Sequence, residues 1–228
     1  MDHKFSGYSV WLEPDERQGR LFSNKIESLS QRCCPLNSSD EAADMVFAPH
    51  CTLLYNIHIK DECKGRDLLI EARDKFRHYC SKNIAAFESH YRGKSESNSI
   101  EGDGRLIITP EAFYYFPYPK EADNGKGFGC LILMILLEKS AALAVLHSIV
   151  TEIFPSDERH GEQGGTFQPH LAFCYAAESN TWLEEEKSLM DNDSNSQELL
   201  LPFHGKYLTL WKTEGTISQW ILIAKIKL

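Results

Sequence analysis

Two histidines occur in the same seven-residue frame in distant parts of the chain. Residues 47–53 read FAPHCTL and residues 167–173 read FQPHLAF, so both segments share the pattern Phe-x-Pro-His followed by largely apolar residues. The two histidines, His50 and His170, are separated by about half of the 228-residue chain. We interpret this repeat as the sign of two related lobes that each contribute one histidine.

Each motif is expected to begin a β-strand, because proline donates no backbone hydrogen bond and suits the first position of a strand. Side chains two residues apart in a strand share a face, so His50 projects with Thr52, and His170 with Ala172. Two facing imidazoles can divide acid and base roles, since one can be neutral while the other is protonated. The Thr52 hydroxyl can donate to a phosphate oxygen in a transition state. This chemistry needs neither a metal ion nor a cofactor.

Other residue types are less informative. The seven cysteines include no CxxC pair, and only Cys33 and Cys34 are adjacent, which disfavours a zinc site or a disulfide framework and predicts reduced, mostly structural thiols. Cys51 alternates away from His50 and is expected in the core. The acidic run 184–186 is expected to be a solvated helix face, and the other seven histidines are expected to be surface or core residues.

The composition bounds the partners and the location. Hydrophobic residues make up 42% and charged residues 25%, as in ordinary globular proteins. A formal charge of −9 disfavours binding to long nucleic acid but allows a small nucleotide substrate. The beginning of the chain shows no signal or transit pattern, and the longest apolar run, 130–137, is too short to cross a bilayer. We therefore expect a cytoplasmic monomer that does not bind membranes.

Hydrophobic periodicity predicts strands that alternate with three long amphipathic helices. Their order is not strict βαβα, which indicates an α+β fold with antiparallel or mixed sheets, and no linker divides residues 1–228 into separate domains. A polar segment at 93–104 is expected to be a loop that either covers the site or is passive. The expected strands are 7–14, 50–58, 85–91, 105–116, 128–138, 170–176, 207–211 and 220–227. The three amphipathic helices are expected at 17–33, 63–79 and 140–154, and a short acidic helix is expected at 182–190.

Together these features resemble the 2H phosphoesterase superfamily, and within it the cyclic phosphodiesterases of the fungal and plant type. That family carries two His-x-Thr/Ser motifs on inner strands of a bilobal α+β fold, with two sheets facing a central cleft and helices outside. The resemblance runs from the first strand to the last strands. It implies that His50 and His170 are catalytic, that Thr52 binds phosphate, and that Trp11 and Tyr175 line the pocket. Tyr175 lies five residues after His170, so it reaches the same face only if the strand twists or ends.

The resemblance implies metal-independent hydrolysis of a cyclic phosphodiester. The family acts on ADP-ribose 1'',2''-cyclic phosphate, a by-product of tRNA splicing, and on nucleoside 2',3'-cyclic phosphates, which it opens to 2'-phosphates. One histidine activates water and the other protonates the leaving oxygen. This chain departs from the family at Ala172, where a hydroxyl residue is usual. We expect a slower or differently selective enzyme, with Cys174 or Tyr175 as partial substitutes for the missing donor.

Three other readings remain open. Ala172 supports a catalytically weakened protein that binds a nucleotide or an RNA end without turning it over. A phosphodiesterase that trims RNA 3' ends would want a basic groove with interleaved aromatic residues, and the sequence shows only scattered cations. In the third, the chain is a scaffold in which the motifs are remnants. The cyclic phosphodiesterase is the first of these four readings.

Overall fold

The computed structural model describes residues 7–33, 46–90, 105–118, 130–155, 167–177 and 182–228. The segment 93–104, which we considered as a cover for the site, lies outside these residues. The strands are β1 (Tyr8–Pro14), β2 (Cys51–Ile57), β3 (Leu106–Ile108), β4 (Pro110–Tyr118), β5 (Cys130–Leu137), β6 (His170–Ala177), β7 (Phe203–Lys212) and β8 (Ile221–Lys227). The helices are α1 (Glu16–Cys33), α2 (Glu62–His90), α4 (Ala141–Ile153), α5 (Trp182–Asn192) and α6 (Ser194–Gln197), with 3-10 turns η3 (Glu198–Leu200) and η4 (Ile217–Gln219).

The eight strands in the described part of the chain belong to one hydrogen-bonded sheet, in the order β3-β7-β1-β2-β6-β5-β4, with β8 also paired to β7. Every strand pair is antiparallel. The first half of the sheet comprises β3, β7, β8, β1 and β2, and the second half comprises β6, β5 and β4. The halves join between β2 and β6, where the only paired position among the described residues is Cys51 with Leu171. The expected α+β fold is confirmed, and the two expected sheets are halves of one antiparallel sheet.

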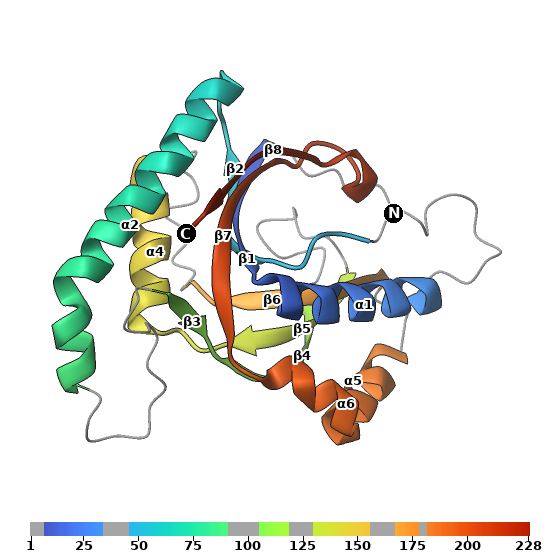
Figure 1. Ribbon diagram of the computed structural model, residues 1–228. Helices are drawn as coiled ribbons and strands as arrows, with labels where there is room; N and C mark the ends of the chain where they lie inside the picture. Colours follow the sequence, from blue (N-terminus) through green and yellow to red (C-terminus); the bar gives the residue numbers. More distant parts are fainter. Residues whose placement is uncertain (1–6, 34–45, 91–104, 119–129, 156–166, 178–181) are drawn as a thin grey trace.

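Helices pack on one face of this sheet, and two of them cross between the halves. Helix α1 follows β1 of the first half but contacts β6 of the second, whereas α4 follows β5 of the second half and contacts β2 of the first. Figure 1 shows α4 beside α2, and α1 near α5 and α6. Phe22 of α1 packs against Phe173 of β6, with ring centroids 6.0 Å apart. This reciprocal exchange is the structural counterpart of the sequence repeat.

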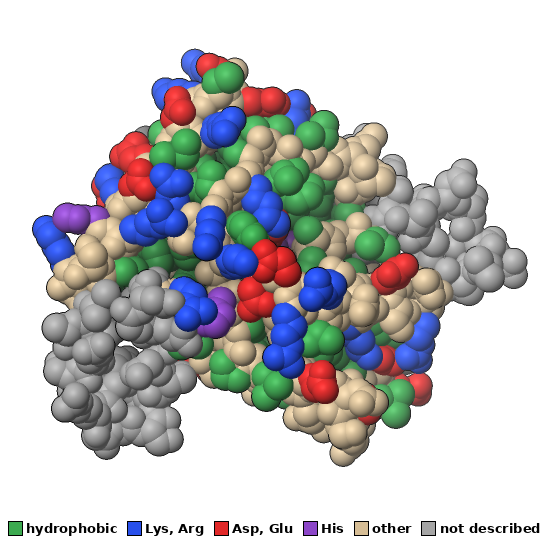
Figure 2. Space-filling model, viewed as in Figure 1, with side chains coloured by type: hydrophobic (Ala, Val, Ile, Leu, Met, Phe, Trp, Pro, Cys, Tyr) green, Lys and Arg blue, Asp and Glu red, His purple; other side chains and the backbone are tan. Residues whose placement is uncertain are grey.

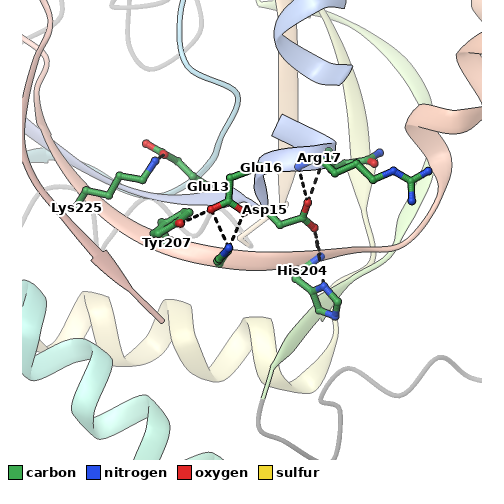
Figure 3. A network of polar contacts seen from close by, with 9 residues as sticks. Glu13, Asp15, Glu16, Arg17, His204, Tyr207 and Lys225 are labelled. Atoms are coloured by element: carbon green, nitrogen blue, oxygen red, sulfur yellow. Dashed lines mark hydrogen bonds and ion pairs between the residues drawn. The ribbon is translucent and has the colours of Figure 1, made fainter. Parts of the chain in front are cut away.

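A capped junction fixes the end of β1 to the start of α1. The carboxylate of Asp15 accepts hydrogen bonds from the backbone N–H groups of Arg17 at 2.9 Å and Gln18 at 3.1 Å, as an N-cap residue does. Its other oxygen accepts from the backbone N–H of His204, at the start of β7, at 3.3 Å. Figure 3 shows these contacts at the first turn of α1. Strand β1, which carries Trp11, is therefore held at its carboxyl end by both neighbours in the chain and in the sheet.

Two expected elements differ from the structure. The strand expected at 85–91 is wrong, because α2 continues to His90; residues 80–90 contain neither glycine nor proline, so nothing stops the helix from propagating. The single strand expected at 105–116 is split, because β3 pairs with β7 of the first half and β4 pairs with β5 of the second. Pro110, which donates no backbone hydrogen bond, begins β4 after the change of partner. None of the described helices is long and apolar enough to cross a membrane.

Candidate functional site

The two histidine motifs are neighbours at the middle of the sheet. Cys51 of β2 pairs with Leu171 of β6 in antiparallel register. Moving one residue along each strand places His50 opposite Ala172 and Thr52 opposite His170, with directly opposed Cβ atoms about 5 Å apart. Cys51 and Leu171 themselves point to the helix-covered face, where they are 3% and 1% exposed. We call the face that carries His50 and His170 the histidine face.

Both imidazoles are held by the same local hydrogen bond. His50 donates from Nδ1 to the carbonyl of Ala48 at 2.5 Å, and His170 donates from Nδ1 to the carbonyl of Gln168 at 3.0 Å. A carbonyl oxygen only accepts, so the proton of each neutral ring lies on Nδ1 and Nε2 has a free lone pair. The shared frame explains the repetition, because the proline before each histidine restricts the backbone of the residue that offers the carbonyl. In each motif, Nε2 is the atom available for proton transfer.

Burial keeps both rings neutral. His50 is only 7% exposed, and this burial lowers its pKa to about 3; the Ala48 carbonyl opposes the shift, and the nearby His170 adds to it. Burial also lowers the pKa of His170, against the opposing effect of the Gln168 carbonyl. His170 keeps more solvent contact than His50. Burial therefore favours the neutral form of both rings, and His170 is the ring with more access to solvent.

Trp11 is buried and lies against His50. The indole and imidazole rings are stacked, with centroids 3.6 Å apart and planes within 9°. Trp11 is 2% exposed, so almost none of its surface is left for a ligand. It is also the direct partner of Thr52 in the β1–β2 pairing. The structure thus describes Trp11 as a contact of His50, and its expected role in lining a pocket stays a prediction.

Tyr175 reaches the histidine face because β6 contains a β-bulge. In the β5–β6 pairing, Ala172 is opposite Met134 and Tyr175 is opposite Ile132, so three residues of β6 span two residues of β5. Met134 and Ile132 share a face of β5, and their partners must share it too. The ring of Tyr175 lies 5.6 Å from that of Phe47, which lies 5.9 Å from His50. Strict alternation fails here because of the extra residue.

Two expectations about the cysteines are wrong, and the bulge explains the first of them. Cys174 pairs with Leu133, whose neighbours in register face the helices, so its sulfur points away from the histidines. Cys174 is moreover disulfide-bonded. It has no thiol to donate to a phosphate, and the cysteines are not all reduced. Cys51 is a core residue, as expected; burial raises the pKa of its thiol to about 12.

Three contributors to the site were not recognised in the sequence. Phe47 was quoted only as part of the motif, yet its ring contacts both His50 and Tyr175. Trp211 of β7 stacks on Trp11, with centroids 4.8 Å apart, and Glu13 of β1 accepts a hydrogen bond from the Trp211 indole. The contacts of Trp211 cross strands that are far apart in the sequence, so only the pairing of β1 with β7 could have identified them. Phe47 meets Tyr175 because the two motifs lie together at the middle of the sheet.

No second chemical centre competes with the histidines among the described residues. No group of three or more His, Cys, Asp or Glu side chains in this part of the chain could hold a metal ion. A hollow along α2 is formed by side chains of that one helix and includes neither histidine of the motifs; it is lined by Asp67, Ile70, Glu71, Asp74, Lys75 and His78. We place the candidate site at the histidines because there the geometry and the protonation states fit a reaction.

Comparison with known proteins gives little beyond this geometry. No family model and no curated protein matches the chain. Among solved structures, Usb1 of Kluyveromyces marxianus with uridine monophosphate is 14% identical, with a TM-score of 0.38 over 95% of this chain and 96% of that one. A second structure of Usb1 from the same organism is 13% identical, with a TM-score of 0.40 over 96% and 98% of the two chains. At these values the likeness carries no functional information.

The buried histidines should make the protein less stable in acid. Between the unfolded pKa, about 6.5, and the folded pKa of His50, about 3, the unfolded chain binds a proton that the folded chain does not, so stability falls as the pH falls. His50 alone should lower the free energy of unfolding by about 2 kcal/mol as the pH falls from about 6.5 to about 5. Urea unfolding of wild type and His50→Asn at several pH values measures this, with the exposed His78→Asn as control. Equal pH slopes for wild type and His50→Asn would contradict it.

Proposed function

We propose that the protein is a metal-independent phosphodiesterase in which His50 and His170 act as an acid–base pair on a nucleotide phosphodiester. The observation that carries this proposal is the pairing of two imidazoles from adjacent strands on one face, each fixed through Nδ1 with Nε2 available. A single structural histidine needs no such partner. Two rings in this arrangement can supply both proton transfers of a hydrolysis.

Cyclic phosphodiesters of small nucleotides are the substrates that we place first. These are ADP-ribose 1'',2''-cyclic phosphate and nucleoside 2',3'-cyclic phosphates, the latter opened to 2'-phosphates. In such a ring, the attacking water and the leaving sugar oxygen lie on opposite sides of one phosphorus, a span that two residues on neighbouring strands can bracket. One imidazole takes the proton of water as the new P–O bond forms. The other gives its proton to the sugar oxygen as the old P–O bond breaks.

Differences between the two histidines suggest which has which role. A phosphate anion between the rings favours their charged forms and raises both pKa values. His170, which is more exposed, takes a proton first and serves as the acid. His50 is more deeply buried and stays neutral, so it serves as the base. After each turnover His50 holds a proton and His170 does not. His50 then loses its proton, and His170, the more exposed ring, takes a new proton from bulk solvent.

The two halves of the site offer unequal anchors for phosphate. Thr52, beside His170, has a hydroxyl that can donate to a phosphate oxygen, whereas Ala172, beside His50, has only a methyl group. Removing one donor to a developing charge typically slows an enzyme about 10²- to 10³-fold. Tyr175 is the next residue of β6 on the histidine face and the nearest hydroxyl on that strand. We propose a slowed enzyme whose phosphate lies closer to Thr52 than to Ala172.

A second candidate is a phosphodiesterase that acts on RNA 3' ends, and one observation favours it. Tyr114 and Phe116 of β4 are opposite Met134 and Ile132, which places both rings on the histidine face, 43% and 39% exposed. They lie two strands from β6, about 10 Å away, too far for the base of a mononucleotide at the histidines. Aromatic rings at this distance suit the stacked bases of an oligonucleotide. The net charge of −9, and the mixture of acidic and basic side chains on the face shown in Figure 2, keep this candidate second.

The acid–base pair is tested by turnover with EDTA present. Hydrolysis of 2',3'-cyclic AMP and of ADP-ribose 1'',2''-cyclic phosphate should fall about 10²- to 10⁴-fold in His50→Ala and in His170→Ala, because each removes one proton transfer. The double variant should lose little more than either single variant, since the rings act as a unit. Undiminished turnover in either single variant would refute the pair. A folded wild type that binds these nucleotides without hydrolysing them would instead establish the weakened binder.

Restoring the missing hydroxyl tests the anchor argument. Ala172→Ser should raise kcat/KM on the preferred cyclic phosphate by about tenfold or more, because it adds a donor beside His50. Ala176→Ser is the matched control, since Ala176 is equally buried on the same strand but faces the helices through its pairing with Leu131. Equal rates for wild type and Ala172→Ser would show that the anchor is not missing.

Removal of the exposed rings separates the two substrate classes. If RNA is the substrate, Tyr114→Ala with Phe116→Ala should slow the shortening of an oligonucleotide at its 3' end by about tenfold or more, since each lost stack is worth about 1–3 kcal/mol. Hydrolysis of 2',3'-cyclic AMP should not change. Tyr55→Ala serves as control, because Tyr55 is 52% exposed toward the far end of β2. No shortening by wild type would remove this candidate.

A further inference from the structure

A continuous set of contacts, which passes through β7, joins His50 to a buried carboxylate on the neighbouring strand β1. His50 stacks on Trp11, and Trp11 stacks on Trp211, with ring centroids 3.6 Å and 4.8 Å apart. The indole Nε1 of Trp211 donates to Glu13 Oε1 at 3.3 Å and to Thr209 Oγ1 at 3.1 Å. Strands β1 and β7 and the residue before β2, all in the first half, thus meet on one side of the His50 imidazole. We call His50, Trp11, Trp211 and Glu13 the His50 stack.

Glu13 is held firmly enough to anchor this stack. Its side chain is only 9% exposed, and Oε2 accepts a hydrogen bond from Lys225 Nζ at 2.6 Å. Lys225 lies over the Tyr207 ring, 4.3 Å from its centroid, which fixes the ammonium group from the other side. Figure 3 shows the ammonium of Lys225 directed at Glu13. A buried carboxylate with a charged partner and an indole donor leaves few alternative rotamers for Trp211.

The stack supplies a constraint that the motif itself lacks. The hydrogen bond to Ala48 fixes one atom of the His50 ring, but the ring can still tilt about that bond. Contact with the flat face of Trp11 sets the plane of the ring, and the two constraints together define the position of Nε2. Among the described residues, no ring stacks on His170 in this way. A shift of about 1 Å in a reacting group can cost about 100-fold in rate.

Glu13 reaches His50 through other side chains and not directly. Leu12 pairs with Cys51, so Glu13 stands beside His50 in the sheet register. Its described hydrogen bonds nevertheless go to Trp211 and Lys225, whereas Nδ1 of His50 is bonded to Ala48. An acid–histidine dyad would instead place the carboxylate on Nδ1. The Glu13 carboxylate therefore affects His50 only through the rings of Trp211 and Trp11.

We infer that Trp11 and Glu13 are positioning residues for His50, and that Glu13 acts through Trp211 and Trp11 to hold the imidazole plane in its reactive orientation. The effect on rate rests on the proposed function, but the effect on the ring does not. Loss of the stack frees the imidazole to tilt, which lowers kcat and leaves substrate binding nearly unchanged. Trp11→Phe keeps a flat ring and retains most of the function, whereas Trp11→Leu does not.

The test combines imidazole ¹⁵N NMR of His50 with kcat and KM on 2',3'-cyclic AMP. In Trp11→Leu and Glu13→Gln, the His50 resonances should broaden and lose the pure Nδ1–H pattern, and kcat should fall about 10- to 100-fold with KM within about threefold. Trp11→Phe should restore both readouts to within about threefold of wild type. The matched control is Glu186→Gln, which removes another buried carboxylate bonded to a lysine, Lys25, on a helix that does not contact the His50 stack.

Each outcome decides the inference. Unchanged His50 resonances in Glu13→Gln, or an equal change in Glu186→Gln, would overturn it, and so would a loss of thermal stability without any change at His50. If Trp11→Leu does not fold, Glu13→Gln and Lys225→Met carry the same test from the other end of the stack. If wild type hydrolyses no substrate, the proposed function fails, but the NMR comparison still decides whether the stack orients the ring.

Discussion

The site depends on one backbone pairing, that of Cys51 in β2 with Leu171 in β6. It joins the two halves of the sheet and places two histidines from distant parts of the chain on adjacent strands. Closing so long a loop costs conformational entropy, which apolar burial on the helix-covered face offsets. Helices α1 and α4 each follow a strand of one half and contact the other half, so they hold this junction from behind. The sheet could not open between β2 and β6 without exposing both helices.

The junction also buries both histidines, which makes their protonation costly. Neutral imidazoles are compatible with burial, but protonated ones are not, so the environment lowers both pKa values. The carbonyls of Ala48 and Gln168 partly oppose this lowering of the pKa values, and they fix the tautomer of each ring. A phosphate anion between the rings would favour their charged forms and raise both pKa values. Perturbed pKa values at the meeting point of two repeats are typical of sites that exchange protons.

The two halves are related but not equivalent. His50 is buried, stacked on Trp11 and opposite Ala172, whereas His170 is more exposed and opposite Thr52. These differences support the division of acid and base roles that we propose. The first half gives its histidine a rigid orientation, and the second half gives its histidine access to solvent. The bulge in β6 adds Tyr175 to the side that lacks a second hydroxyl anchor.

The sequence by itself determined the features that depend on neighbouring residues. The Phe-x-Pro-His repeat predicted two strands that each begin at or beside a histidine, and alternation along β2 and before the bulge in β6 predicted which residues share the histidine face. Periodicity predicted most elements of the α+β fold. It failed at 85–91, where local propensity suits either state and the preceding helix simply continues.

Only the tertiary structure decided the properties that depend on contacts across the sheet. The bulge between Ala172 and Cys174 arises from the pairing with β5, and it moves Tyr175 to the histidine face and Cys174 away from it. The division of 105–116 between two strands follows from a change of partner at Pro110. The role of Trp11 depends on how deeply it is buried and on which ring meets its face, and both are set by β2 and β7. Burial and pairing are properties of residues brought together by folding, so no local pattern in the sequence encodes them.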